Sequence, residues 1–123
     1  MFMDIVISNT SIEPIYQQVY NQIIADILSG ELPADFCLPS IRVIARELNV
    51  SVITIKKAWD NLEENGFIYT IAGKGCFVSN LTTKNLDDKR IKLAKEYLEI
   101  EINYLKNLGL TKNEVKELID KLY

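Results

Sequence analysis

Apolar side chains recur at helical spacing across residues 14–29. Pro14 suits the first turn of a helix because its missing N–H would have no intrahelical partner there, and Gly30 is typical of a helix end. Ser11 or Glu13 is the expected N-terminal cap. The apolar positions are Ile15, Val19, Ile23, Ile27 and Leu28. Their spacing predicts a helix that turns one face to the core.

Two shorter helical patterns follow, with a tight turn between them. Residues 39–48 begin at Pro39 and Ser40, and residues 51–65 begin at Ser51, a favourable N-cap. Asn49 and Val50 form the turn. The apolar positions are Ile41, Ile44, Ala45 and Leu48 in the first pattern, and Ile55, Ala58, Trp59 and Leu62 in the second. Both patterns predict short amphipathic helices.

The side chains left outside these two helices are candidates for binding. At 100° per residue, they are Arg42, Arg46, Ile53, Lys57, Asp60 and Glu64, with Lys56 on the flank. An isoleucine in an exposed first turn suits apolar contact with a thymine methyl. A singly exposed apolar residue without a role is the alternative for Ile53.

After Gly66, residues 67–71 and 76–79 are short runs with β propensity. The Ala-Gly-Lys-Gly between them predicts a tight hairpin loop whose glycines tolerate positive φ. Lys74 at its tip is placed to reach a phosphate or a minor groove, or is only a solvated lysine in a turn. Together the segments from Leu38 to Ser79 have the layout of a winged helix-turn-helix.

The last third of the chain predicts two further helices. Residues 84–108 carry an apolar stripe that ends before Gly109, and Thr111 with Glu114 forms a capping-box pattern for a last helix. The stripe consists of Ile91, Ala94, Leu98, Ile102 and Leu105. This surface is larger than a two-helix hairpin can bury, which favours a homodimer. The alternative is that the tail packs on its own domain as extra core.

The charge is distributed unevenly along the 123 residues. Residues 1–79 hold five basic and nine acidic side chains, and all five cations lie within the predicted helix-turn-helix and hairpin. Such a local cationic face suits a phosphate backbone even though the whole chain has a net charge of −3. We therefore expect an α+β fold with a winged helix-turn-helix DNA-binding domain at 1–79 and a helical dimerisation tail at 80–123.

Composition argues against several other classes of protein. The chain has no histidine, no catalytic constellation of paired carboxylates and no nucleophile motif, so we expect no enzyme, no metal site and no cofactor. Cys37 and Cys76 belong to no CxxC pair and are expected to be reduced thiols. No apolar run of about 18 residues and no signal-peptide pattern is present, so we expect a cytoplasmic protein without membrane contact.

An ordered set of motifs resembles the DNA-binding domain of the GntR family of bacterial transcription regulators. The matching segments are PIYQQ (14–18), SGEL (29–32), LPSIR (38–42), AREL (45–48), SVITIKKA (51–58), LE (62–63), GFI (66–68) and GKGCFV (73–78). The resemblance implies that Arg42, Thr54, Lys56 and Gly73 contact operator DNA, with Ser51 and Lys57 beside them. Lys74 completes the expected contacts on the hairpin.

Val52 departs from the family pattern, in which Arg often follows the serine at the start of the recognition helix. Val52 therefore occupies an expected DNA-contact position without a guanidinium to read guanine. The SVITIKKA segment and the short tail look like the YtrA branch of the family. This resemblance implies control of genes for membrane transport or envelope stress, and a small effector. A cleft at Tyr97 and Tyr104 could hold an effector, and dimer core is the alternative for these rings.

The sequence thus predicts a sequence-specific transcription regulator, a repressor that binds a palindromic operator as a homodimer. A winged-helix module for protein interaction without DNA binding is the alternative, because Asp60, Glu63 and Glu64 would repel phosphate if they faced it. The convergence of Arg42, Lys56 and Lys74 on one face would favour DNA as the partner.

Overall fold

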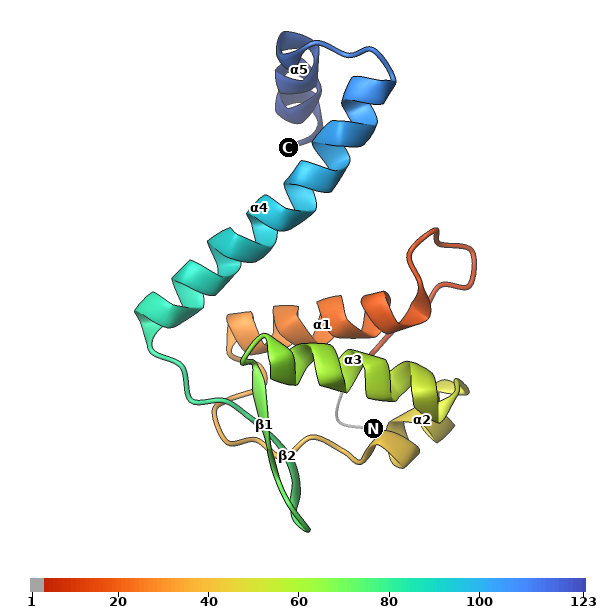
Figure 1. Ribbon diagram of the computed structural model, residues 1–123, viewed down its shortest axis with the longest axis vertical. Coiled ribbons are helices and arrows are strands. Elements are labelled where there is room, and N and C mark those ends of the chain that lie inside the picture. Colours follow the sequence, from red (N-terminus) through yellow and green to blue (C-terminus); the bar gives the residue numbers. More distant parts are fainter. Residues whose placement is uncertain (1–3) are drawn as a thin grey trace. The chain divides into compact units, whose positions relative to one another are not determined.

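The computed structural model describes residues 4–123. Its elements, in order, are α1 (Ile15–Ser29), α2 (Ile41–Leu48), α3 (Val52–Glu64), β1 (Ile68–Ile71), β2 (Gly75–Val78), α4 (Thr83–Asn107) and α5 (Lys112–Leu122). The chain divides into two compact units, Met1–Leu81 and Thr82–Tyr123, whose elements are labelled in Figure 1. The α+β class predicted from the sequence is confirmed.

Helix α1 has the predicted length but not the predicted cap. Pro14 is its N-cap residue, and no side chain caps the helix there. The Ser11 hydroxyl instead accepts a hydrogen bond from the Glu13 N–H at 3.1 Å, within the preceding turn. The expectation that Ser11 or Glu13 caps α1 is therefore wrong. Gly30 ends the helix in the left-handed conformation with φ of +86°, as predicted.

The side chain of Gln18 fixes the segment before α1. Its Oε1 accepts from the Ser8 N–H at 2.8 Å, and its Nε2 donates to the carbonyls of Ser8 and Glu13, both at 2.9 Å. Gln22, one turn further on, bonds the N–H and carbonyl of Val6 in the same way. Two glutamines spaced i, i+4 thus satisfy backbone groups that a loop would otherwise leave to water.

The core of the first unit lies where α1, α2 and α3 pack with the base of the hairpin (Figure 1). The large side chains that are less than 2% exposed are Val19, Ile23, Ile44, Ile55, Leu62, Phe67 and Val78. Trp59 is 3% exposed and Ala58 is fully buried. The core face predicted for the third helix is confirmed, and each large apolar side chain buried there stabilises the fold by about 1.5–3 kcal/mol.

Helices α2 and α3 are joined by a short turn. Asn49 ends α2 in the left-handed conformation with φ of +56°. The side chain of Ser40 accepts from the Val43 N–H, and that of Ser51 accepts from the Thr54 N–H, so a serine caps each helix. These capping bonds confirm the turn and the N-cap predicted for α3.

The hairpin is antiparallel, with Ile68 opposite Val78 and Ile71 opposite Gly75. Each strand begins and ends within one residue of the predicted bounds. The segment before α2 lies along β2, where the Leu38 N–H donates to the Cys76 carbonyl and the Val78 N–H to the Phe36 carbonyl, both at 2.9 Å. This extra pairing covers one edge of the hairpin.

The second unit consists of α4 and α5. Thr82 caps α4, and Thr111 with Glu114 forms the predicted capping box of α5. Neither helix contains a buried residue. Along the predicted stripe, Ile91 is 71% exposed and Leu98 is 50% exposed. Part of the stripe predicted from the sequence is therefore exposed.

Candidate nucleic-acid interface

The first turn of α3 presents apolar side chains to solvent on a rigid base. Val52 is 45% exposed and Ile53 is 80% exposed. The Ser51 hydroxyl lies 3.1 Å from the Thr54 N–H and 2.7 Å from the Thr54 hydroxyl. Because both hydroxyls are engaged in the cap, this turn offers a fixed backbone with two apolar side chains at its surface.

The two lysines of α3 make different contacts. The Lys56 ammonium lies 2.7 Å from the Asp60 carboxylate, one turn further along the helix. The Lys57 ammonium lies 4.0 Å from the centre of the Tyr16 ring, on α1. Lys56 is thus held along α3, whereas Lys57 reaches across to a neighbouring helix.

Helix α2 contributes two exposed arginines, Arg42 and Arg46, spaced one turn apart. Neither takes part in the ion pairs found in the part of the chain that the structure describes, which join Lys56 to Asp60 and Arg90 to Asp87. Their guanidinium groups are therefore available for an anionic partner.

The hairpin tip is formed by a turn in which the Lys74 N–H donates to the Ile71 carbonyl at 2.9 Å. Gly73 has φ of +78°, and no heavy atom beyond its two chain neighbours lies within 4 Å of the position that a Cβ would take. The tip is open to the close approach of another molecule, and Lys74 is exposed there.

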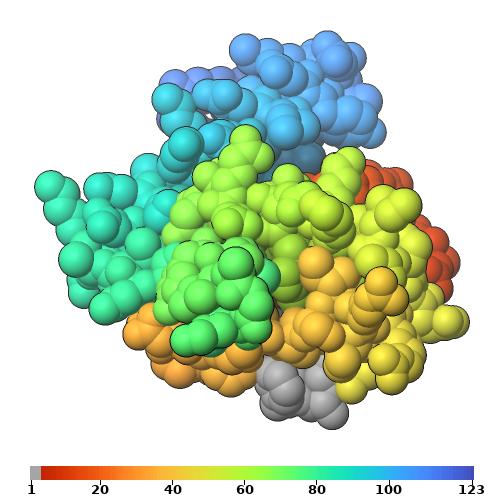
Figure 2. Space-filling view, turned by 60° about the horizontal axis from the view of Figure 1, so that its bottom comes forward, coloured from red at the N-terminus to blue at the C-terminus, as the bar shows by residue number. Residues whose placement is uncertain are grey.

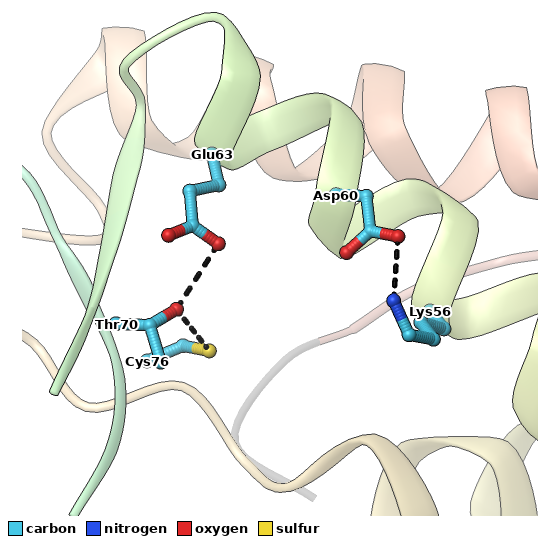
Figure 3. A network of polar contacts seen from close by, with 5 residues as sticks. All are labelled: Lys56, Asp60, Glu63, Thr70 and Cys76. Carbon is cyan, nitrogen blue, oxygen red and sulfur yellow. Dashed lines mark hydrogen bonds and ion pairs between the residues drawn. The ribbon is translucent and has the colours of Figure 1, made fainter. Parts of the chain in front are cut away.

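Polar contacts tie the hairpin to the rest of the first unit. The Thr70 hydroxyl on β1 donates to the Glu63 carboxylate of α3 at 3.1 Å and lies 3.4 Å from the Cys76 sulfur (Figure 3). On the same strand, the Tyr69 hydroxyl donates to Asp35 at 2.7 Å, and this bond raises the pKa of the phenol. The hairpin is thereby held in place beside α3.

The residues predicted to bind DNA come from three neighbouring elements. Figure 2 shows the yellow of α2, the yellow-green of α3 and the green of the hairpin adjoining one another in the first unit. Sequence reasoning missed Tyr16 and Thr70, whose contacts join separate elements, α1 with α3 and β1 with α3. The Lys56–Asp60 pair could have been found from its i, i+4 spacing.

Two structural features are absent from residues 4–123. No group of three or more side chains suited to hold a metal ion occurs there. No helix in the same range is long and apolar enough to cross a membrane.

Three helices, a tight turn before α3 and a two-stranded hairpin beside it define a winged helix-turn-helix DNA-binding domain. The chain matches the family described as "Bacterial regulatory proteins, gntR family" over residues 15–78. It is 35% identical over 107 residues to the uncharacterized HTH-type transcriptional regulator YhcF of Bacillus subtilis, covering 87% of this chain and 88% of YhcF. The chain therefore belongs to the GntR family of transcription regulators, which are not enzymes.

The resemblance to YtrA stated from the sequence is also confirmed. The HTH-type transcriptional repressor YtrA of Bacillus subtilis is 31% identical over 86 residues, which cover 70% of this chain and 66% of YtrA. The chain spans less than half of the length of two other curated repressors that it matches.

Solved structures show the same fold. A GntR family transcriptional regulator from Listeria monocytogenes superposes with a TM-score of 0.69 at 29% identity, covering 94% of this chain and 98% of that one. The DNA-binding domain of AraR in complex with its operator ORR3 has a TM-score of 0.53 at 30% identity, covering 60% of this chain and 89% of that one. The match to AraR supports operator DNA as the partner of the winged helix.

Proposed function

We propose that this regulator is a repressor that binds a palindromic operator as a homodimer. Repressors among its relatives, YtrA included, support the direction of regulation. The observation that carries the proposal is the first turn of α3, which is capped by Ser51 and leaves Ile53 80% exposed. Such a turn suits insertion into a major groove.

The proposed contacts divide by chemistry. Val52 and Ile53 meet base edges, where a thymine methyl would pack on Ile53. Arg42, Lys56 and Lys74 supply cations for phosphates or guanine edges. The remaining proposed contacts are Ser51, Thr54, Lys57 and Gly73. Gly73 would act through its backbone, since no side chain blocks its approach.

The tail is proposed to make the homodimer, with residues 1–79 binding DNA and residues 80–123 joining the two copies. The stripe of α4 that would meet its counterpart consists of Ile91, Ala94, Leu98, Ile102 and Leu105. Support comes from the absence of any buried residue in α4 and α5. A second copy with the same stripe would remove this surface from water, and two linked domains would match a twofold operator.

Target genes and effector are proposed on the resemblance to YtrA alone. Genes for membrane transport are the proposed targets, and a small molecule is the proposed effector. Tyr97 and Tyr104 are 55% and 59% exposed, so their rings are free either to bind that effector or to join the dimer core.

Selection of bound duplexes from a random pool, followed by footprinting, tests the proposed function. We expect a palindrome with two protected half-sites whose centres lie about one helical turn, roughly 34–36 Å, or a multiple of it apart. Protection of a single half-site, or recovery of no preferred sequence, would contradict it.

A further inference from the structure

The exposed face of α3 carries a carboxylate directly beside the cation that is proposed to meet DNA. The Asp60 carboxylate lies 2.7 Å from the Lys56 ammonium, and their side chains are 58% and 62% exposed. Figure 3 shows both on one helix, with Glu63 one turn further along and bonded to Thr70 of the hairpin. Glu63 is therefore already engaged in holding the hairpin, whereas the only contact found for Asp60 among the described residues is with Lys56.

We propose that Asp60 is a specificity-determining residue that competes with DNA phosphates for the Lys56 ammonium. This inference rests on the proposed function, in which Lys56 contacts DNA. A phosphate that approaches Lys56 must displace the Asp60 carboxylate and meets the repulsion of its charge. Asp60 thus makes the contact between Lys56 and any phosphate less favourable in free energy.

The effect differs between unselected DNA and the operator. Binding to unselected DNA depends almost wholly on the attraction between cations and phosphates. At the operator, the contact proposed for Lys56 is instead with a guanine edge, which carries no net charge and which the Asp60 carboxylate opposes less than it opposes a phosphate. Loss of the Asp60 charge should therefore strengthen binding to unselected DNA more than binding to the operator, and the ratio of the two affinities should fall.

Asp60→Asn tests this, with Glu64→Gln as the matched control. Glu64 is exposed on the same helix, and no ion pair is found for it within residues 4–123. Both variants raise the net charge by one. Fluorescence anisotropy would follow binding to a random-sequence duplex of about 30 base pairs and to the duplex that the wild-type protein selects, over a series of salt concentrations.

We expect Asp60→Asn to bind the random duplex about two- to five-fold more tightly at low salt, as suits the loss of one exposed ion pair. The gain should shrink as salt rises. The affinity of Asp60→Asn for the operator duplex should rise by a smaller factor. Equal gains for Asp60→Asn and Glu64→Gln would overturn the proposal, because net charge alone would then account for them.

The same comparison in a Lys56→Ala background separates the two proposals. If Asp60 acts through Lys56, Asp60→Asn has little effect once Lys56 is replaced, and an undiminished effect there would overturn the inference. Unchanged binding of the single Lys56→Ala variant would instead remove the contact proposed for Lys56, and the role of Asp60 with it. If Lys56→Ala weakens DNA binding as expected but Asp60→Asn does not strengthen it, only the role of Asp60 is refuted.

Discussion

At the scale of residues, the exposed cations of the first unit differ in how far they are already engaged. Lys56 is paired with Asp60, and Lys57 lies over the Tyr16 ring. Arg42 takes part in neither of the ion pairs found between residues 4 and 123. An unengaged guanidinium loses no protein contact when it binds a phosphate or a guanine edge, so Arg42 should contribute more to DNA binding than either lysine.

Replacing Arg42 with alanine should therefore weaken operator binding. The expected loss is about 1–3 kcal/mol if the guanidinium reads a base edge, or a salt slope lower by about one unit if it binds phosphate. Binding isotherms at several salt concentrations distinguish the two. Arg46→Ala removes the same charge one turn further along α2, outside the proposed contacts, and controls for the change in net charge. An Arg42→Ala variant with the isotherm and slope of the wild type would show that Arg42 does not contact DNA.

Gln18 has a different role, since the residue is 9% exposed and its side chain satisfies three backbone groups. Gln18→Ala should lower the free energy of unfolding by about 1–3 kcal/mol, because those groups lose partners in a partly buried place. Urea denaturation measures the change. Gln22→Ala, whose bonds to Val6 are exposed, should cost less, and an equal loss for both variants would contradict the dependence on burial.

At the scale of elements, the N-termini of α4 and α5 are each capped by a threonine. The backbone and side chain of Thr111 bond to Glu114 and hold the pKa of its carboxyl below the ordinary value of 4.5. A depressed pKa in the folded state means that the ionised form stabilises the helix above the unfolded pKa. This contribution is lost as pH falls through the folded pKa.

Glu114→Gln keeps a side chain that can complete the capping box but removes its titration. Circular dichroism between about pH 3 and pH 6 should show wild-type helix content or thermal stability declining below about 4.5, with part of that decline missing in the variant. Glu117→Gln, on the same helix, is the control for loss of a carboxylate. A wild-type decline that persists unchanged in Glu114→Gln would place its origin in other groups.

The helix and strand positions could be predicted from the sequence because their signals are local. Serine caps, the turn at Asn49 and apolar spacing each depend on residues within one or two turns. The prediction of the α1 cap was wrong because the Ser11 hydroxyl accepts a competing hydrogen bond within its own turn. The contacts of Lys57 with Tyr16 and of Thr70 with Glu63 could not be predicted, since they depend on how separate elements pack.

At the scale of the whole molecule, the two units differ in how much of their apolar surface is buried. The first has a closed core, whereas no residue of α4 or α5 in the second is buried, and Ile91 and Leu98 of its apolar stripe are exposed. The first unit is also acidic overall, with five basic against nine acidic side chains in residues 1–79. A single winged helix of this charge should bind DNA weakly, so the affinity of the regulator should depend on joining two copies.

Leu98→Glu tests that dependence at the middle of the stripe. A carboxylate there would be buried without a partner in the dimer, so we expect the variant to sediment as a 14.1 kDa monomer at micromolar concentration, while the wild type sediments as a dimer. Operator affinity should fall on the order of 100-fold with the loss of the second half-site contact. Asn103→Glu makes the same charge change on the opposite side of α4 and should leave both measurements unchanged. A wild-type protein that sediments only at 14.1 kDa would refute the dimer outright, and a monomeric Leu98→Glu variant with undiminished operator affinity would show that one winged helix suffices.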